Sequence, residues 1–573
     1  MATDLRSLLA ERLQAAFDTV EPGADPVLRA SDRADYQANG ALALAKRRGE
    51  SPRQVAEGIL GVLELDDICT SAEVSGPGFI NLFLSSDFVA RQVAAMAGDE
   101  RLGVPSVAAK ETVVVDYSAP NVAKEMHVGH LRTTLIGDAL CRMLTFVGHE
   151  VVRENHVGDW GTPFGMLIEH LLDLGEETGA HELSVGDLNA FYRQARASFD
   201  ADETFRDRSR QRVVLLQQGD AETLRLWRVL VTESIRYFDE VYAKLGVLLT
   251  DDDVVGESYY NPMLADVVAE LGRKGILVED AGAQCVFPPG FTNRQGEPLP
   301  LIVQKSDEGF GYAATDLAAL RDRVQRLGAD RMLYVVGAPQ AQHLLMCFAV
   351  ARMAGWLHDG VQAVHVSFGN VLGADHKMLK SRSGESVKLV ELLDEAVERA
   401  APLVADRAGE DGGTEGGDIA RAVGIGAVKY ADLSTERTRD YVFDWDRMLA
   451  FEGNTGPYLQ YAHARIRSIF RRGAVEPPEP LDPSLEEPAE RALAIELLRF
   501  NEAFQESLAT YSPHKLCGYL FSLAAFFTTF YESCRVLVDD EQLRRSRLLL
   551  CDLTGRVLAC GLGLLGMEAP ARM

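Results

Sequence analysis

The run SAPNVAKEMHVGH, residues 118–130, comes directly after a strand-like segment at 112–117 and directly before a helical pattern at 131–146. Strand, turn and helix in this order form the repeating unit of an open, mostly parallel α/β sheet. Ligands of such sheets bind at the carboxyl ends of the strands. The run therefore predicts a nucleotide-binding loop in a doubly wound, Rossmann-like domain.

Two histidines, His127 and His130, stand three residues apart where the predicted helix begins. Side chains at this spacing share one helix face, so both can point at one bound group. Gly129 between them has no Cβ, which lets a base or a ribose approach the backbone. The free N–H groups at the start of a helix also favour phosphate. The alternative is a structural pair, because two histidines on a helix often have no ligand.

A second loop, HKMLKSRSG at 376–384, follows another strand-like run at 364–368 and gathers cations among small polar residues. Lysines in such a loop can act as mobile positive charges on the pyrophosphate that leaves a nucleoside triphosphate. We expect Lys377 and Lys380 to act in this way. The alternative is a basic loop that only meets solvent.

Together the two loops resemble the paired HIGH and KMSKS signatures of class I aminoacyl-tRNA synthetases, as HVGH at 127–130 and KMLKS at 377–381. The departure is Leu379, where the signature has serine. Further runs are similar to the arginyl-tRNA synthetases, in order and over almost the entire chain. Besides residues 118–130, where Ala119 replaces a frequent serine, they are GDWG at 158–161, YAATD at 312–316, QAQH at 340–343, LTGRVL at 553–558 and EAPARM at 568–573.

The resemblance implies an ATP-dependent arginine–tRNA ligase. Such an enzyme activates L-arginine to arginyl-adenylate, then transfers arginine to the 3′-terminal adenosine of tRNA(Arg), releasing pyrophosphate and AMP. The implied catalytic residues are His127, His130, Lys377 and Lys380, and the implied ATP site contains His127, Gly129, His130 and Lys380. Mg²⁺ would arrive with ATP. The family also implies that tRNA is needed for the activation step, as in induced fit.

A pocket for the arginine side chain must offer acceptors to five N–H donors held in one plane. Tyr312 and Asp316 lie four residues apart, one turn of a helix, and could offer a phenol and a carboxylate. The alternative makes Asp316 a helix cap and Tyr312 a packing residue. By resemblance the arginine site also contains Ala119, Pro120, Asn121, His130 and Gln340, and Asp116 at its strand end is a further acidic candidate.

The composition fits a large globular protein: 573 residues, 47% hydrophobic and 25% charged, enough for three or more domains. Eight cysteines without a CxxC pair argue against a zinc ribbon and a disulfide framework, so we expect no protein-bound zinc and reduced thiols. The first 20 residues contain no apolar signal-peptide core, and no run approaches the roughly 18 apolar residues of a membrane span. We expect a cytoplasmic monomer that does not bind membranes.

The net charge of −27 at first argues against a nucleic-acid partner. From residue 451 onward, however, 13 Lys and Arg stand against 16 Asp and Glu, so this segment is nearly neutral. Two basic sets there could contact RNA or could be solvated helix faces. They are Arg465, Arg467, Arg471 and Arg472, and Arg544, Arg545 and Arg547.

Three domains are predicted from the order of the patterns. Residues 1–108 form an N-terminal α+β domain, which by resemblance contacts tRNA. Residues 109–450 form the catalytic domain, with a helical insertion at about 167–245 and the lysine loop at 376–384. Residues 451–573 form an all-α bundle, which by resemblance binds the anticodon. An acidic, Gly-rich stretch at 405–418 is expected to be a surface loop.

Three alternatives to the arginine enzyme remain. A glutamyl or cysteinyl enzyme of the same class would need cations or zinc ligands in its pocket, against the acidic run at 312–316. A tRNA-binding paralogue without activity could have lost His127, His130 or Lys380, all of which are present. An adenylating enzyme for small substrates would not need the C-terminal helical domain.

Overall fold

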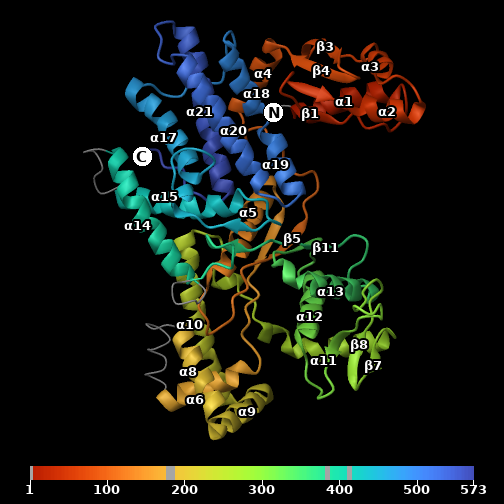
Figure 1. Ribbon diagram of the computed structural model, residues 1–573, viewed down its shortest axis with the longest axis vertical. Helices are drawn as coiled ribbons and strands as arrows, with labels where there is room; N and C mark the ends of the chain where they lie inside the picture. Colours follow the sequence, from red (N-terminus) through yellow and green to blue (C-terminus); the bar gives the residue numbers. More distant parts are fainter. Residues whose placement is uncertain (1–3, 176–187, 381–386, 409–415) are drawn as a thin grey trace. The chain divides into compact units, whose positions relative to one another are not determined.

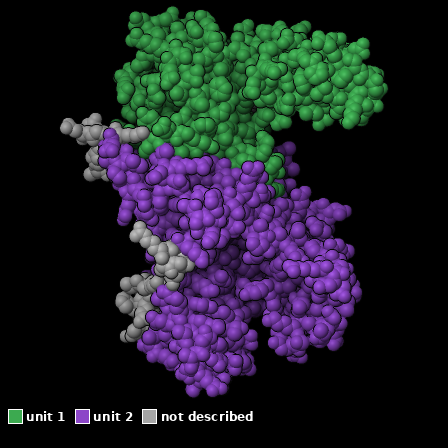
Figure 2. Space-filling model, viewed as in Figure 1, with its two compact units in different colours: residues 1–106, 451–563, 568–573 green, residues 107–450, 564–567 purple. Residues whose placement is uncertain are grey.

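The computed structural model describes residues 4–175, 188–380, 387–408 and 416–573 (Figure 1). The chain divides into two compact units (Figure 2). The first consists of Met1–Ser106, Phe451–Gly563 and Glu568–Met573, and the second of Val107–Ala450 and Leu564–Met567. Residues 381–384 of the lysine loop and 409–415 of the acidic loop lie outside the described residues.

A parallel four-stranded sheet forms the centre of the second unit. Its strands are β5 (Thr112–Asp116), β6 (Glu150–Glu154), β10 (Arg331–Tyr334) and β11 (Gln362–His365), in the order β11-β10-β5-β6. From β5 the chain first adds a strand on one side and then, with β10, on the other. The switch point of the sheet therefore lies between β5 and β10, where ligands of such folds bind. The predicted fold class is confirmed.

The sequence of β5 explains its central place, because Val113, Val114 and Val115 are all buried and a strand covered on both faces needs an unbroken apolar run. The helix that follows, α5 (Leu131–Val147), is buried along almost its whole length. It ends at Gly148, which takes a left-handed conformation with φ 98°. A glycine ends helices in this way at no steric cost.

Three helices pack with β5 and β10 in one hydrophobic core, and they later supply the candidate arginine site. They are α11 (Glu257–Arg273), α12 (Tyr312–Gln325) and α13 (Ala341–Met353). The remaining elements of this unit include β7 (Val278–Asp280), β8 (Ala283–Val286), β9 (Leu301–Gln304), β12 (Val371–Leu372), β13 (Tyr441–Val442), α14 (Leu389–Ala408), α15 (Gly416–Leu433), α16 (Trp445–Met448) and the 3-10 turns Val128–His130, Asp251–Asp253 and Ala338–Gln340.

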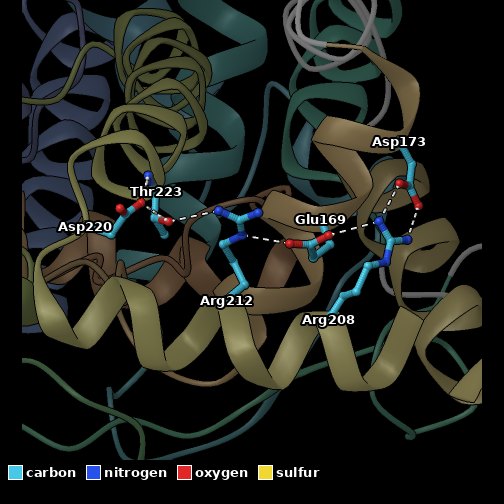
Figure 3. Close-up of polar contacts among 6 residues, drawn as sticks. All are labelled: Glu169, Asp173, Arg208, Arg212, Asp220 and Thr223. Carbon is cyan, nitrogen blue, oxygen red and sulfur yellow. Dashed lines mark hydrogen bonds and ion pairs between the residues drawn. The ribbon is translucent and has the colours of Figure 1, made fainter. Parts of the chain in front are cut away.

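The region predicted as a helical insertion contains α6 (Pro163–Leu174), α8 (Leu188–Ala201), α9 (Glu203–Gln218) and α10 (Ala221–Leu245). A buried carboxylate, Glu169 of α6, joins α6 to α9 (Figure 3). It lies 2.7 Å from Nε of Arg212 and 3.1 Å from Arg208, which also holds Asp173 through two hydrogen bonds. Arg212 also donates a hydrogen bond to the hydroxyl of Thr223 on α10, at 3.0 Å. The network fixes three helices against one another.

The first unit combines the two ends of the chain. Its antiparallel sheet has the order β1-β2-β4-β3, from β1 (Leu28–Ala30), β2 (Tyr36–Ala38), β4 (Phe79–Leu84) and β3 (Cys69–Ser75). Its N-terminal helices are α1 (Leu5–Asp18), α2 (Gly40–Arg48), α3 (Pro52–Leu60) and α4 (Ser86–Ala97). Its C-terminal helices are α17 (Gly456–Gly473), α18 (Pro488–Leu498), α19 (Phe500–Ala509), α20 (His514–Ser533) and α21 (Glu541–Leu564), the last residue of which belongs to the second unit.

A two-pronged ion pair joins the two ends within the first unit. Both guanidinium prongs of Arg491 bind the carboxylate of Asp35, at 3.0 and 2.6 Å. Arg499 donates to the carbonyl of Asp35 at 2.8 Å, and its guanidinium lies over the buried ring of Tyr36. The sequence did not predict that the N-terminal and C-terminal regions share one compact unit. Among the described helices, none is long and apolar enough to cross a membrane.

Candidate active site

The HVGH motif forms the 3-10 turn Val128–His130 that leads into α5. Its two histidines cap this turn reciprocally. The N–H of Gly129 donates to Nδ1 of His127 at 3.0 Å, and the N–H of His127 donates to Nδ1 of His130 at 3.1 Å. The ring centroids lie 4.2 Å apart. The two imidazoles are therefore neighbours, as their spacing predicted.

The caps also determine which ring nitrogen carries the proton. Because a backbone N–H donates to each Nδ1, the neutral rings carry hydrogen on Nε2 and present it as a donor. Burial is the main cause that lowers both pKa values, to about 3 for His130, and the charge of Lys124 lowers the pKa of His127 further. Both rings therefore stay neutral near pH 7 and can donate hydrogen bonds to phosphate or ribose oxygens.

Gly129 is needed for a reason that the sequence did not show. A Cβ at this position would lie 2.6 Å from the ring of His127, closer than real side chains come. The glycine therefore makes room for the histidine that caps the turn. Two of the N–H groups expected to face phosphate, those of Gly129 and His127, are bound by imidazoles instead.

The segment that follows the lysine loop pairs with the HVGH turn. The N–H of Val128 donates to the carbonyl of Val387 at 3.0 Å, and the N–H of Leu389 donates to the carbonyl of Met126 at 2.9 Å. These bonds form a short antiparallel bridge at His127. Although about 250 residues separate the two motifs in the sequence, the backbone thus joins one to the exit of the other.

A charged group strengthens the same connection. Nζ of Lys388 lies 3.0 Å from Oε2 of Glu125, a buried carboxylate two residues before His127. Asn189 of α8 donates to the same carboxylate at 3.1 Å. Glu125 therefore links the HVGH turn, the exit of the lysine loop and the helical insertion.

Lys377 and Lys380 both lie exposed to solvent. The chain before and between them turns back on itself: the N–H of Gly373 donates to the carbonyl of Lys377 at 2.8 Å, and the N–H of Leu379 donates to the carbonyl of Val371 at 3.2 Å. Leu379, the departure from the KMSKS signature, is half-buried in this turn. Contact of the two lysines with phosphate stays a prediction.

Three carboxylates lie near one another at the carboxyl edge of the sheet. Asp316 is in the second turn of α12, Glu257 opens α11, and Asp159 follows β6. Burial and the charges of Asp159 and Asp316 together raise the pKa of Glu257 to about 7. Asp159 is held by the N–H and the hydroxyl of Ser258, at 2.8 and 2.6 Å. A cation such as a guanidinium would relieve the repulsion among these groups.

The other candidates for the arginine site surround the same edge. Tyr312 is the first residue of α12 and lies one turn before Asp316. It is 75% exposed, so its ring does not pack into the core. Asn121 and Gln340, which ends the turn Ala338–Gln340 after β10, are exposed too. A Cβ on Gly158 would come within 2.3 Å of Oδ1 of Asn121, so this glycine makes room for the amide.

The loop between β5 and the HVGH turn has an unusual backbone. Ser118, Ala119 and Ala123 all have positive φ, at 72°, 49° and 58°. Such strain persists where the surroundings hold it in place, and functional sites are enriched in it. Here the N–H of Ala119 donates to Asn155 at 3.0 Å, while Pro120 is buried and accepts from the N–H of Gly158 at 3.1 Å.

Asp116 has a partner inside the protein. Its carboxylate lies 2.8 Å from Arg323 of α12, which is fully buried and also lies 2.6 Å from Glu154 of β6. An arginine of the chain therefore neutralises this strand-end carboxylate. Assignment of Asp116 to the substrate stays a prediction, and the observed pair favours a structural function at the base of the site.

One cluster contains donor atoms of metal-ligating types. Asp316, His343 and Cys347 place one ligand atom each within 4.8 Å of one another. Nε2 of His343 and Oδ2 of Asp316 are already joined by a hydrogen bond of 2.6 Å. Burial and the charge of Asp316 raise the pKa of the Cys347 thiol well above its usual value. The ligand-type atoms of His343 and Asp316 thus bind each other in this structure.

Sequence reasoning missed three residues of this region. Glu257 and His343 meet Asp316 only through the packing of α11, α12 and α13, and no spacing in the sequence joins them. Lys124 acts on His127 from the same loop, and its place three residues before the HVGH motif could have indicated it. A similar run, HVGD at 156–159, has aspartate in place of the second histidine, and its His156 stacks on Tyr260.

The two basic sets of the C-terminal bundle are partly used inside it. Arg547 is buried against Glu490 at 2.7 Å, Arg467 pairs with Asp552 at 3.0 Å, and Arg465 lies over the ring of Tyr531. These three therefore stabilise the bundle, and contact of either set with RNA stays a prediction.

A doubly wound sheet with an HVGH turn at its switch point, joined to the exit of a lysine loop, defines a class I aminoacyl-tRNA synthetase. A family model described as tRNA synthetases class I (R), catalytic domain, matches residues 92–445. The DALR anticodon binding domain matches residues 459–573, and the arginyl-tRNA synthetase N-terminal domain matches residues 3–84.

Full-length relatives agree. The arginine–tRNA ligase of Thermobifida fusca is 56% identical over all of both chains. The crystal structure of arginyl-tRNA synthetase from Plasmodium falciparum superposes with a TM-score of 0.88 at 30% identity, over all of both chains. The arginyl-tRNA synthetase of Thermus thermophilus gives 0.84 at 26% identity, covering 99% of this chain and all of the other. The chain belongs to the arginyl-tRNA synthetases, and the predicted arginine–tRNA ligase is confirmed.

Proposed function

We propose that this site activates L-arginine with ATP and then esterifies tRNA(Arg). The observation that carries the proposal is the pair of neutral, capped histidines beside a group of three carboxylates at one sheet edge. The histidine pair suits an anionic nucleotide, and the three carboxylates suit a guanidinium. The reaction is attack by the carboxylate of arginine on the α-phosphate of ATP, which requires positioning and charge neutralisation rather than a protein nucleophile.

For ATP, His127 and His130 donate from Nε2 to oxygens of the phosphates or the ribose. Gly129 keeps the turn between them open. Lys377 and Lys380 neutralise the charge of the pyrophosphate as it leaves, which stabilises the transition state electrostatically. Mg²⁺ would arrive with ATP and would supply further positive charge to the phosphates.

For arginine, Asp316 and Glu257 neutralise the guanidinium, and Tyr312, Asn121 and Gln340 offer neutral acceptors around it. Ala119 and Pro120 set the path of the loop that holds Asn121. Because lysine is a point charge without the planar fork of a guanidinium, we expect this site to bind it more weakly than arginine.

The tRNA occupies both terminal regions, with the bundle of α17 to α21 at the anticodon. We infer that the enzyme is a cytoplasmic monomer and that tRNA completes the site before arginine is activated. Binding of a correct substrate that assembles a catalytic site is the general form of induced fit.

The test is ATP–pyrophosphate exchange with arginine, with and without cognate tRNA, using lysine, glutamate and cysteine as controls. Exchange with arginine only in the presence of tRNA supports the substrate and the order of binding. Exchange with arginine in the absence of tRNA keeps the substrate and removes the tRNA requirement. Exchange with a different amino acid, or none under any condition, contradicts the assignment of the arginine site.

A further inference from the structure

The candidate arginine carboxylate is not free before the substrate arrives. Nε2 of His343, in the first turn of α13, forms a hydrogen bond of 2.6 Å with Oδ2 of Asp316 on α12. Both side chains are partly open to solvent, at 33% and 27% exposure. Among the described side chains, no other donates a hydrogen bond to this carboxylate. One oxygen therefore meets an imidazole and the other is available to a ligand.

We propose that His343 is a proton-linked positioning residue: protonated, it holds and neutralises Asp316 in the empty site, and it releases its proton when the guanidinium of arginine binds there. The inference deepens the proposed function and rests on its assignment of Asp316 to arginine. The imidazole acts through Asp316 and forms no bond with substrate.

The charges around His343 and Asp316 support the release of a proton when a guanidinium binds. Glu257 of α11, Tyr334 of β10 and Cys347 of α13 are the titratable groups that interact with Asp316 from the surrounding elements. Cys347 also lies 3.7 Å from Nε2 of His343. These three groups are acidic or neutral, so His343 is the group beside Asp316 that can carry a positive charge in their midst.

The hydrogen bond that His343 donates to Asp316 raises the pKa of His343 above its usual value, against the opposing effect of burial. A bound guanidinium neutralises Asp316 and adds a like charge near the ring, and both effects lower the pKa of His343 again. By linkage, arginine binding then releases a proton, and arginine affinity falls as pH falls through the pKa of His343 in the empty site. A one-unit drop in this pKa corresponds to an affinity change of about tenfold.

Glu257 would also release a proton when arginine binds, because its pKa is raised to about 7 and its carboxyl group must ionise to hold a cation. A pH profile of the unaltered enzyme cannot separate the two groups. The variants His343→Gln and Glu257→Gln can. Glutamine at 343 can donate an amide N–H to Asp316 but does not titrate.

The experiment is titration calorimetry of arginine into the full-length protein with a chelator present, in two buffers of different ionisation enthalpy at about pH 7, where histidine titrates. The number of protons released is compared among the unaltered enzyme, His343→Gln, Glu257→Gln and the exposed-histidine control His358→Gln. It is run with and without cognate tRNA.

We expect His343→Gln to release clearly fewer protons than the unaltered enzyme and to lose the roughly tenfold part of the pH dependence of arginine affinity that His343 contributes, while the part from Glu257 remains. The control should match the unaltered enzyme. Equal proton release by His343→Gln and the unaltered enzyme would overturn the proposal and leave Glu257 as the source. Absence of arginine binding by the unaltered enzyme in every condition would contradict the arginine site itself, which is a different failure.

If His343→Gln does not fold, His343→Asn and an NMR titration of the imidazole rings replace it. The chain has 12 histidines. In the unaltered enzyme, the resonance that His343→Asn lacks should report a pKa that falls when arginine is added. An unchanged pKa for that resonance contradicts the proposal.

Discussion

His127, a candidate catalytic residue, and His358, an exposed one, have similar local geometry. In both, Nδ1 accepts a hydrogen bond from the N–H two residues later, at 3.0 Å and 3.3 Å. Only His127 has a second imidazole beside it, with a centroid separation of 4.2 Å. The difference between a turn-capping residue and a candidate ATP ligand therefore lies in the neighbouring ring and not in the cap.

His130→Ala should lower the rate of ATP–pyrophosphate exchange about 100-fold, because a neutral Nε2–H donor to the transition state is lost. The measurement is exchange at saturating ATP and arginine with tRNA present. His358→Ala is the matched control and should change the rate less than twofold, an approximate limit for a site far from the chemistry. A loss below about threefold for His130→Ala would remove this residue from the site.

Asp316→Asn should raise the arginine KM about 100-fold and change the ATP KM little, because a charge-assisted bond to the guanidinium is replaced by a neutral amide. Steady-state kinetics with each substrate varied in turn measures both constants. An unchanged arginine KM would contradict the assignment of this carboxylate. A parallel rise in the ATP KM would indicate a general disturbance of α12 instead.

At the scale of elements, the two signature motifs work together through a short bridge. The exit of the lysine loop pairs with residues 126–128, and Lys388 adds an ion pair with the buried Glu125. Because an ion pair shielded from water is stronger than one in solvent, this connection can set where the loop returns to the sheet.

Lys388→Met should lower the exchange rate about tenfold and raise the ATP KM, because the lysine loop loses its charged attachment and Glu125 loses its cation. The matched control is Lys244→Met, which removes the ion pair between Lys244 and Asp394. Their side chains are 40% and 55% exposed, respectively. Exposed pairs contribute little, so this variant should behave as the unaltered enzyme. Equal effects of the two substitutions would show that the bridge has no special function.

At the scale of the whole molecule, the two ends of the chain form one compact unit. Arg491 of α18 and Asp35 before β2 are 456 residues apart in the sequence, yet their side chains form two hydrogen bonds. A region expected to contact tRNA at the N-terminus is thereby fixed to the bundle expected to bind the anticodon. The two predicted RNA contacts would then move together.

Arg491→Ala should lower the free energy of unfolding by about 2 kcal/mol, because it leaves the largely buried Asp35 without its cation. It should also raise the tRNA KM more than the arginine KM. Denaturant unfolding and aminoacylation kinetics are the measurements. Arg53→Ala, which removes an exposed pair with Glu57 on α3, is the control and should stay within about 0.5 kcal/mol of the unaltered protein. Equal destabilisation by both would contradict the coupling.

The class of fold, the histidine motif and the family could all be predicted from the amino-acid sequence, because they depend on local patterns: an apolar strand, a histidine pair and the order of the motifs along the chain. Which charged side chains lie next to one another became visible only in the folded protein. Asp116 faces Arg323, Glu257 approaches Asp316, and His343 binds the same carboxylate. The physical reason is that pKa values and ion pairs depend on distances of a few ångströms between helices, which no spacing in a sequence specifies.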